Sequence, residues 1–412
     1  MITNTLWNAM GLVVPSLVAI PAMAVMARIL GVEKFGIFML TFSVLGYAGV
    51  FDGGLTRAVI RSIAMHDDDE KLNREVVGTA SYAVLAMGLV GALLVHFGAR
   101  PIADLLNVSP AVLADTVAAL ELLALVIPLY LLSLVWFAYL EGKQRFVKLS
   151  VLKTITGLVV ALLPVAAVLV RPTLTAALAG LLIARAVTMV VAYFPCRAGL
   201  AAGVFHFQGA TLRDLWRFGG WITVSNIASP ILAYMDRFIL SHLLGAGRVA
   251  FYAAPSEVVV RMSVIPGAAS RTIFPLFSKL QGAAAGEARI AYRGLFVVCT
   301  LIAIPIFVFA EWILTMWLGA PYGDESAGIL RILLVGFIFN AVAQVPYSRI
   351  QAHGHSRVTA LVHLFELLPY LAVLALLVRE YGLIGAAFAW TLRVGVDLVA
   401  LQILSRRLVG GP

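Results

Sequence analysis

The sequence predicts an all-α integral membrane protein with about twelve transmembrane helices in two six-helix lobes. Composition, continuous apolar runs and an internal repeat support this prediction. Of the 412 residues, 62% are hydrophobic and 12% are charged, whereas soluble domains carry roughly 25% charged residues. That apolar content supplies about a dozen helices of ~20 residues each. The runs are continuous and do not alternate with polar residues, which excludes an outer-membrane barrel as well as a soluble or disordered chain.

Apolar stretches of membrane-spanning length follow one another along the whole chain. The first lacks the basic start and the small-residue cleavage pattern of a signal peptide, so we expect it to be a retained helix. The linkers are short, with tight hairpins at Arg171-Pro172 and Arg379-Glu380. The expected spans are 9–27, 35–61, 77–97, 117–140, 154–170, 173–195, 218–242, 249–275, 294–312, 328–348, 358–378 and 381–404.

The loops on one side of these spans are richer in Lys and Arg. Sixteen lie in 62–76, 141–153, 196–217, 276–293, 349–357 and 405–412, against six in the loops on the other side. Basic loops stay in the cytoplasm, so we expect both termini to be cytoplasmic. Membrane topology then accounts for the net charge of +9, and a nucleic-acid partner is not expected.

The two halves of the chain resemble each other in sequence. A shift of 214 residues places Gly31 on Gly245 and Arg57 on Arg271. A shift of 212 aligns Gly142 with Gly354, and a shift of 208 aligns Arg185 with Arg393. This ordered series predicts two lobes, 1–204 and 218–412, with 205–217 as a cytoplasmic interfacial linker. Six helices per lobe give both lobes the same orientation, related by a pseudo-twofold axis along the membrane normal.

Charged residues inside the spans are the strongest functional signal. A charge at the centre of a membrane helix costs roughly 2.5–3.5 kcal/mol, so these residues must line a polar cavity or pair with one another. The arginines are Arg57, Arg61, Arg185, Arg237, Arg261, Arg271, Arg331 and Arg393, and the acids are Asp52, Asp236, Glu257, Glu366 and Asp397.

Arg57 and Arg271 occupy equivalent positions in the two halves, and Arg261 and Arg237 lie deep in their spans. Guanidinium groups suit phosphate and carboxylate recognition, so these four residues are the candidate substrate site. The alternative for Arg57 and Arg61 is that they reach the cytoplasmic headgroups. Asp236, Glu257, Glu366 and Asp397 are candidate sites for a coupling proton or sodium ion. Their alternative role is structural: Asp236 and Arg237 would each pair with a neighbouring helix, and Glu257–Arg261 and Arg393–Asp397 would form intrahelical pairs.

Other chemistry is not indicated. The only Gly-Lys pair, at 142–143, continues with Gln144, so no P-loop is present. Cys196 and Cys299 lie far apart in apolar surroundings and predict neither a disulfide nor a metal site. The outer loops contain no histidine. We therefore expect no catalytic residues, no metal, no cofactor and no enzymatic activity.

The run ARILGVEKFGIFMLTFSVLGYAGVFDGGLTRAVIRSIA at 27–64 resembles the polysaccharide-unit (Wzx-type) flippases of the multidrug/oligosaccharidyl-lipid/polysaccharide exporter superfamily. MDRFILSHLLGAGRVAFYAAP at 235–255 and the loops around Gly142 and Gly354 are similar to them as well. The resemblance covers essentially the whole chain. Its motifs are diffuse, so it indicates the superfamily better than the substrate.

The resemblance implies a flippase of the bacterial inner membrane. It would move undecaprenyl-diphosphate-linked oligosaccharides to the periplasmic leaflet by alternating access, for O-antigen or exopolysaccharide assembly, with an ion gradient as driving force. Arg57, Arg261 and Arg271 match the basic positions of the family's cationic cavity. Implied partners are the lipid-linked oligosaccharide, membrane lipids, a polysaccharide polymerase and a chain-length regulator. The rivals are an ion-coupled multidrug antiporter, a lipid II flippase, which usually has extra C-terminal helices, and a membrane scaffold.

Overall fold

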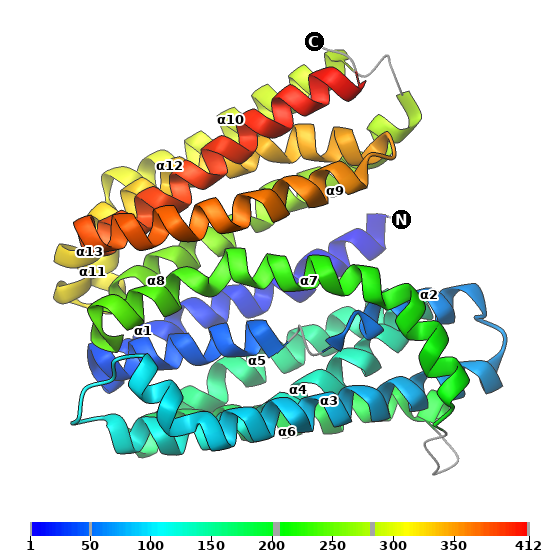
Figure 1. Cartoon of the computed structure of the whole chain (residues 1–412), viewed down its shortest axis with the longest axis horizontal. Helices are drawn as coiled ribbons and strands as arrows, with labels where there is room; N and C mark the ends of the chain where they lie inside the picture. The colour runs from blue at the N-terminus through cyan, green and yellow to red at the C-terminus, as the bar shows by residue number, and fades with distance from the viewer. Residues whose placement is uncertain (1, 49–51, 201–206, 281–284, 410–412) are drawn as a thin grey trace. The chain divides into compact units, whose positions relative to one another are not determined.

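The structure is a computed structural model that describes residues 2–48, 52–200, 207–280 and 285–409, and all regular elements in these ranges are helices (Figure 1). This confirms the predicted all-α class. The helices are α1 (Ile2–Ala48), α2 (Leu55–Met65), α3 (Glu70–Leu105), α4 (Leu113–Gly142), α5 (Phe146–Val170), α6 (Leu174–Leu200), α7 (Gly209–Leu244), α8 (Ala246–Met262), α9 (Val264–Leu280), α10 (Ala285–Val308), α11 (Ala310–Leu318), α12 (Ala320–Ala352) and α13 (Ser356–Val409).

Two of these helices contain a glycine at which the chain reverses. Gly31 in α1 has φ 75° and ψ 173°, and Gly382 in α13 has φ 60° and ψ −134°. Only glycine adopts such a backbone without a steric penalty. Each helix therefore consists of two segments joined by a one-residue turn. This explains why the sequence predicts a pair of spans where the structure has one continuous element.

The described residues include eight helices that are long and apolar enough to cross a membrane. Two of them, α1 and α13, divide at their glycines, and α7 and the α8–α9 pair occupy the two remaining predicted positions. Each predicted span corresponds to helical structure, but 35–61 is not one helix: it covers the second segment of α1 and the separate helix α2, with a turn at 53–54 and residues 49–51 outside the described part of the chain. Most extend beyond the predicted boundaries because the helices continue past the apolar stretch, as α3 does at both ends of 77–97.

By its contacts the chain divides into unit 1, Met1–Tyr234, and unit 2, Met235–Pro412. The division falls within α7, which begins inside the linker expected at 205–217. Residues 201–206, at the expected boundary, lie outside the described part of the chain.

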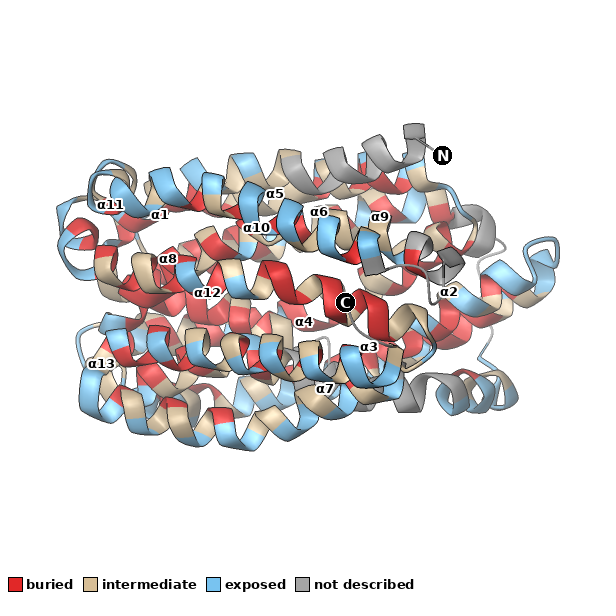
Figure 2. Ribbon diagram, turned by 90° about the horizontal axis from the view of Figure 1, so that it is seen from above, coloured by how far each residue is buried: buried red, intermediate tan, exposed pale blue. Residues whose placement is uncertain are grey.

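Each unit is organised around one central helix. In unit 1, α4 contacts α1, α2, α3, α5 and α6, and in unit 2, α12 contacts α8, α9, α10, α11 and α13. The most apolar windows of α4 and α12 are 56% and 61% buried, against at most 39% for the other candidate spans, and both helices are largely red in Figure 2. The same architecture in both units is what the internal repeat predicts.

The turns after the two central helices have the same hydrogen bonds. The amides of Lys143, Gln144 and Arg145 donate to the carbonyls of Tyr139, Glu141 and Leu140. In unit 2, His353, Gly354 and His355 donate to Arg349, Gln351 and Ile350 in the same pattern. Gln144 and Gly354 both have positive φ, 53° and 85°. Gln144 is therefore the counterpart of Gly354, and the alignment of Gly142 with Gly354 predicted from sequence identity is wrong by two residues.

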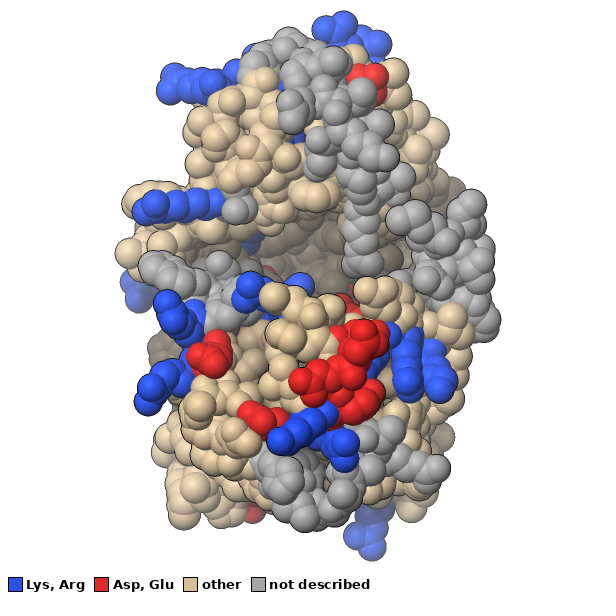
Figure 3. Space-filling model, turned by 90° about the vertical axis from the view of Figure 1, so that its right-hand side faces the viewer, with Lys and Arg blue, Asp and Glu red and all other residues tan. Residues whose placement is uncertain are grey.

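Gly142 must be glycine for a different reason, which is lack of space. A Cβ at this position would lie 2.7 Å from Cβ of Ile63 in α2. Next to it, Lys143 Nζ lies 2.9 Å from Glu70 Oε1 and 3.1 Å from Asp67 Oδ1. Burial acts to lower the pKa of Lys143, but its hydrogen bonds to Glu70 and Asp67 outweigh burial and raise this pKa. The α2–α3 turn is thereby fixed to the end of α4. Figure 3 shows a face of the molecule on which Lys and Arg side chains lie beside Asp and Glu.

Candidate functional site

The first group of charged residues lies between α7 and α8. Gly245, with φ 91° and ψ 150°, reverses the chain between these helices and so brings Asp236 and Arg237 beside residues 252–257. Asp236 and Arg237 are 5% and 2% exposed. The Tyr252 hydroxyl donates to Asp236 Oδ2 at 2.6 Å, and the Arg237 amide donates to Asp236 Oδ1 at 2.8 Å. The Asp236 carboxylate is thus held by two donors inside unit 2.

Glu257 on α8 is shared by two guanidinium groups. Arg237 Nη2 donates to Glu257 Oε1 at 2.9 Å and to Ser256 Oγ at 3.2 Å. Arg261 Nη2 lies 3.6 Å from the other carboxylate oxygen, Oε2, one turn further along α8. The side chain of Arg261 is 24% exposed, whereas that of Arg237 is 2% exposed. Asp236 and Glu257 balance the charges of Arg237 and Arg261, and Arg261 is the more exposed and more loosely held of the two cations.

The second group lies between the two segments of α13. The turn at Gly382 brings Glu366 within 3.8 Å of Arg393 Nε, and the Arg393 guanidinium lies 5.4 Å above the Tyr370 ring. Asp397 Oδ1 lies 3.7 Å from His363 Nε2. A pocket of about 110 Å³ is lined by Glu366, Tyr370 and Arg393 among others.

The two groups influence each other electrostatically. The charge of Arg393 acts on Asp236, and Tyr370 acts on Tyr252. Glu366 and Asp397 are close enough for their like charges to interact. Unit 2 therefore contains one extended network of ionisable side chains, with acidic and basic members on α7, α8 and both segments of α13.

Unit 1 contains a smaller set. The Arg185 guanidinium lies 4.8 Å from the centre of the Tyr130 ring, so an aromatic face on α4 receives this cation. Asp52 accepts from the amide and hydroxyl of Thr56, at 3.1 and 2.6 Å, at the start of α2. Arg57, one position further along α2, is exposed.

The predicted site residues therefore fall into different environments. Arg237 is buried against Glu257, Arg261 is partly exposed, and Arg57 is exposed. The side chain of Arg271 lies outside the described residues. The structural pairs expected for Asp236, Arg237 and Glu257 are present. For Arg393, expected to pair with Asp397, the carboxylate found at 3.8 Å is Glu366.

Sequence reasoning missed the neutral partners in the network, which are Tyr252, Ser256, Tyr370 and the titratable His363. For Tyr370, the i, i+4 spacing to Glu366 is a signal that could have found it. Within the described part of the chain, no cluster of His, Cys, Asp and Glu could hold a metal ion.

Comparison with known proteins gives a consistent family. The sequence profile described as "Polysaccharide biosynthesis protein" matches residues 25–326. A Shigella flexneri protein named "Putative O-antigen transporter" is 40% identical over 99% of this chain and 98% of its own length. The Escherichia coli K12 "Lipopolysaccharide biosynthesis protein WzxC" is 23% identical over 95% of this chain and 78% of its own length.

Solved structures share the fold at low sequence identity. An inward-facing multidrug resistance MATE family transporter of the MOP superfamily matches with a TM-score of 0.79 and 14% identity, over 98% of both chains. The lipid II flippase MurJ, in an inward closed conformation, matches with a TM-score of 0.78 and 12% identity, over 98% of this chain and 87% of that one. These likenesses establish the fold of a MOP-superfamily transporter.

Proposed function

The chain belongs to the polysaccharide biosynthesis protein family, as a Wzx-type flippase of the MOP superfamily, and on this premise we propose which substrate it moves and how. The substrate is an undecaprenyl-diphosphate-linked oligosaccharide repeat unit, carried from the cytoplasmic to the periplasmic leaflet of the bacterial inner membrane. The polymer assembled from it is O-antigen or a related exopolysaccharide. The name of the Shigella flexneri relative supports this class of cargo. A polymerase and a chain-length regulator are the proposed downstream partners.

The observation that carries the substrate proposal is the partly exposed, loosely held guanidinium of Arg261. Arg261 reaches Glu257 through one nitrogen at 3.6 Å, and its Nε has no hydrogen-bond partner within the described structure. A guanidinium has five N–H donors; the Nε of Arg261 is buried, so its Nη groups are the donors that a substrate would reach. A diphosphate supplies the acceptors that match them, in bidentate geometry. Arg57, exposed on α2 of unit 1, stays a predicted substrate-binding residue in its own right.

The proposed coupling site is the group on α13. Two carboxylates that interact with each other, Glu366 and Asp397, stand beside one fixed cation, Arg393, and one histidine, His363. Like charges close together favour binding of one proton by the pair. The charge of Arg393 also acts on Asp236 near the substrate group. A proton bound at Glu366 or Asp397 would therefore alter the field at the residues around Arg261.

The test is depletion of the protein in its host, with mass spectrometry of the lipid extract. We expect one undecaprenyl-diphosphate oligosaccharide to accumulate while the matching surface polymer is lost. Intact surface polymer with altered drug sensitivity would overturn the proposal in favour of an ion-coupled multidrug antiporter. No change in lipid, polymer or drug sensitivity would overturn it in favour of a scaffold.

The site is tested by complementation with Arg261→Gln. We expect export to fall by about tenfold to a hundredfold, because a charge-assisted hydrogen bond contributes about 1.5–3 kcal/mol. The matched control is Arg248→Gln, on the same helix, whose guanidinium pairs with Glu325 at 3.0 Å on the exposed surface. Its export should remain near wild type. Wild-type export by Arg261→Gln at equal membrane level would exclude Arg261 from the site.

A further inference from the structure

Unit 2 contains a basic pocket whose lining residues belong to neither of the groups described above. It has a volume of about 450 Å³ and lies between the ends of α10, α12 and the second segment of α13. Its charged lining residues are Arg289 and Arg293 of α10, Arg349 of α12 and Arg406 of α13. Arg349 is 3% exposed and forms part of the floor, while the other three arginines are exposed and form the rim.

The described residues that line this pocket include no acidic side chain. Among the ion pairs of the described residues, none includes Arg289, Arg293 or Arg406. Four guanidinium groups around one cavity repel one another, and a single anion in the cavity would offset that repulsion for all of them. Phosphate is the anion whose oxygens best match several guanidinium forks at once. The pocket therefore has the chemistry of a phosphate site.

An apolar groove lies further along α12 and the second segment of α13, two of the three helices that line the pocket. It has a volume of about 610 Å³ and runs between Phe339 of α12 and residues from Phe388 to Ile403 of α13. Leu392, Gly395 and Val399 line the groove, and Gln402 and Arg406 line the pocket. Their spacing of three to four residues places all five on one face of the helix. Basic pocket and apolar groove thus form one amphipathic site.

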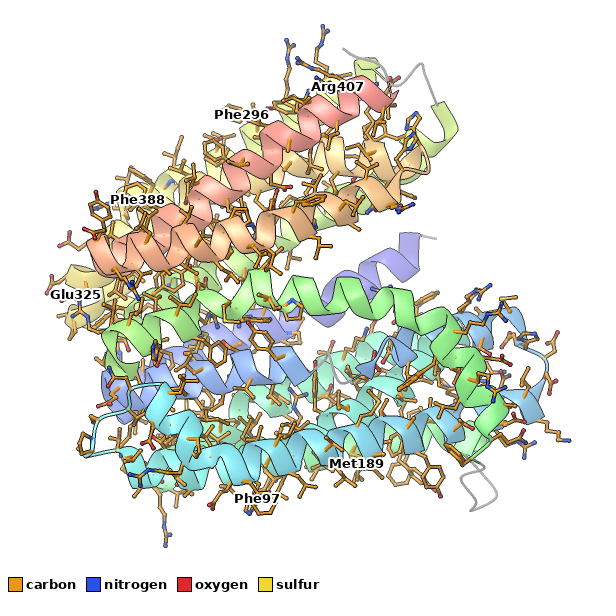
Figure 4. All side chains as sticks on the ribbon, viewed as in Figure 1. Phe97, Met189, Phe296, Glu325, Phe388 and Arg407 are labelled. Atoms are coloured by element: carbon orange, nitrogen blue, oxygen red, sulfur yellow. The ribbon has the colours of Figure 1, made fainter. Side chains whose placement is uncertain are left out.

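The groove has the length of a lipid chain. From Phe388 to Ile403 the helix advances about 22 Å at 1.5 Å per residue, and one leaflet of the hydrocarbon core is about 15 Å thick. Figure 4 shows Phe388 and Arg407 near opposite ends of this segment of α13. A free phosphate ion would use the pocket and leave the groove empty.

We propose that the pocket and groove bind an anionic phospholipid of the bilayer, with its phosphate among the four arginines and one acyl chain along α12 and α13. The loops around the pocket belong to the basic side of the chain, where anionic headgroups attract Lys and Arg. The undecaprenyl carrier shares the phosphate chemistry, but its chain is far longer than this groove. Binding joins the ends of α10 and α13 to the central helix α12.

The test is native mass spectrometry of the delipidated full-length protein with added phosphatidylglycerol or phosphatidylethanolamine. We expect wild type to retain phosphatidylglycerol and to release the zwitterionic lipid. The double variant Arg289→Gln/Arg293→Gln should weaken phosphatidylglycerol binding about tenfold or more. Arg407→Gln, next to a lining residue but outside the pocket, is the matched control and should change binding less than about twofold. Equal losses of phosphatidylglycerol binding in the double variant and in Arg407→Gln would show that binding depends only on general surface charge. This result would overturn the proposal.

Two further measurements distinguish a bound phospholipid from inorganic phosphate and from undecaprenyl phosphate. Val399→Trp fills the groove without altering charge and should weaken phosphatidylglycerol binding as well. Unchanged binding in this variant, or displacement of the lipid by millimolar inorganic phosphate, would show a phosphate site without a lipid. Preferential displacement by undecaprenyl phosphate would assign the pocket to the carrier and overturn the phospholipid proposal. None of these measurements requires export, so they stand apart from the test of the proposed flippase activity.

Discussion

At the scale of single residues, two arginines with the same partner differ in what surrounds them. Arg237 and Arg261 both contact Glu257, at 2.9 and 3.6 Å. Arg237 is almost fully buried and also contacts Ser256, whereas a quarter of Arg261 is exposed. A buried ion pair that loses one partner leaves an uncompensated charge in the interior. The first arginine should therefore matter for stability and the second for substrate.

This difference predicts opposite phenotypes for two identical substitutions. Arg237→Gln should destabilise the protein by about 3–5 kcal/mol, because Glu257 and Asp236 lose their buried cation. Arg261→Gln should cost less than about 1 kcal/mol, because its contact with Glu257 is longer and partly solvated. The midpoint of thermal unfolding of each detergent-purified variant is measured by size-exclusion chromatography after heating. Equal midpoints for the two variants would contradict this assignment.

The sequence located the charged members of this network because a charge inside an apolar run is costly and easily recognised. It predicted the pair Glu257–Arg261 within one helix, but it could not name partners across a turn, which depend on how two helices pack. Arg393 illustrates the limit, since its expected partner is one turn away on the same helix and the carboxylate found near it, Glu366, lies across the Gly382 turn. Tyr252 and Tyr370 carry no charge, so nothing in the sequence separated them from other aromatic residues in spans.

At the scale of helices, two hairpins at equivalent positions use the same backbone device. Gly31 and Gly245 have φ of 75° and 91° with ψ of 173° and 150°. The alignment of Gly31 with Gly245 in the internal repeat is therefore reproduced in geometry, unlike that of Gly142 with Gly354. The difference arises because a hairpin turn of one residue requires glycine, whereas the turn after α4 accepts Gln144 at φ 53°.

The glycine requirement is testable at Gly31. A Cβ at this position would meet nothing within 4 Å, so Gly31→Ala introduces backbone strain without a clash. We expect a loss of about 1–3 kcal/mol. Gly294→Ala is the matched control, because Gly294 also has open space around its Cβ position but lies within α10 without a positive φ. That substitution should be neutral or stabilising by up to about 1 kcal/mol. Similar melting temperatures for the two variants would argue against strain at Gly31.

Helix boundaries were predicted less well than helix number, for a physical reason. An apolar run marks only the part of a helix that crosses hydrocarbon, and the helix continues where its backbone is stabilised outside. Asp69 caps α3 by accepting from the amides of Lys71 and Leu72, so α3 starts at Glu70, seven residues before the predicted span. The short α11 and the interruption between α8 and α9 at Ser263 were not predicted, since they do not interrupt an apolar stretch.

At the scale of the whole molecule, the repeat is expressed as two units that are each built on one central helix. Helices α4 and α12 contact five other helices each and have the most buried apolar windows. The repeat predicts an even number of spans per lobe and therefore the same orientation of both lobes in the membrane. On this prediction, equivalent turns of the two units face the same side, and labelling a few turns tests it.

The Lys and Arg excess predicts which turns face the cytoplasm. Single cysteines can replace exposed residues in turns of both kinds: Asp68 and Arg407 on the basic side, Arg171 and Glu380 on the other. The native Cys196 and Cys299 are buried and should not react. In intact spheroplasts a membrane-impermeant maleimide should label Arg171→Cys and Glu380→Cys, and should label Asp68→Cys and Arg407→Cys only after permeabilisation. The opposite pattern would show that the protein has the inverse topology. The arginine pocket, which includes Arg406, would then lie in the periplasmic leaflet. Labelling of Asp68→Cys and Arg407→Cys on different sides would contradict the same orientation of the two lobes.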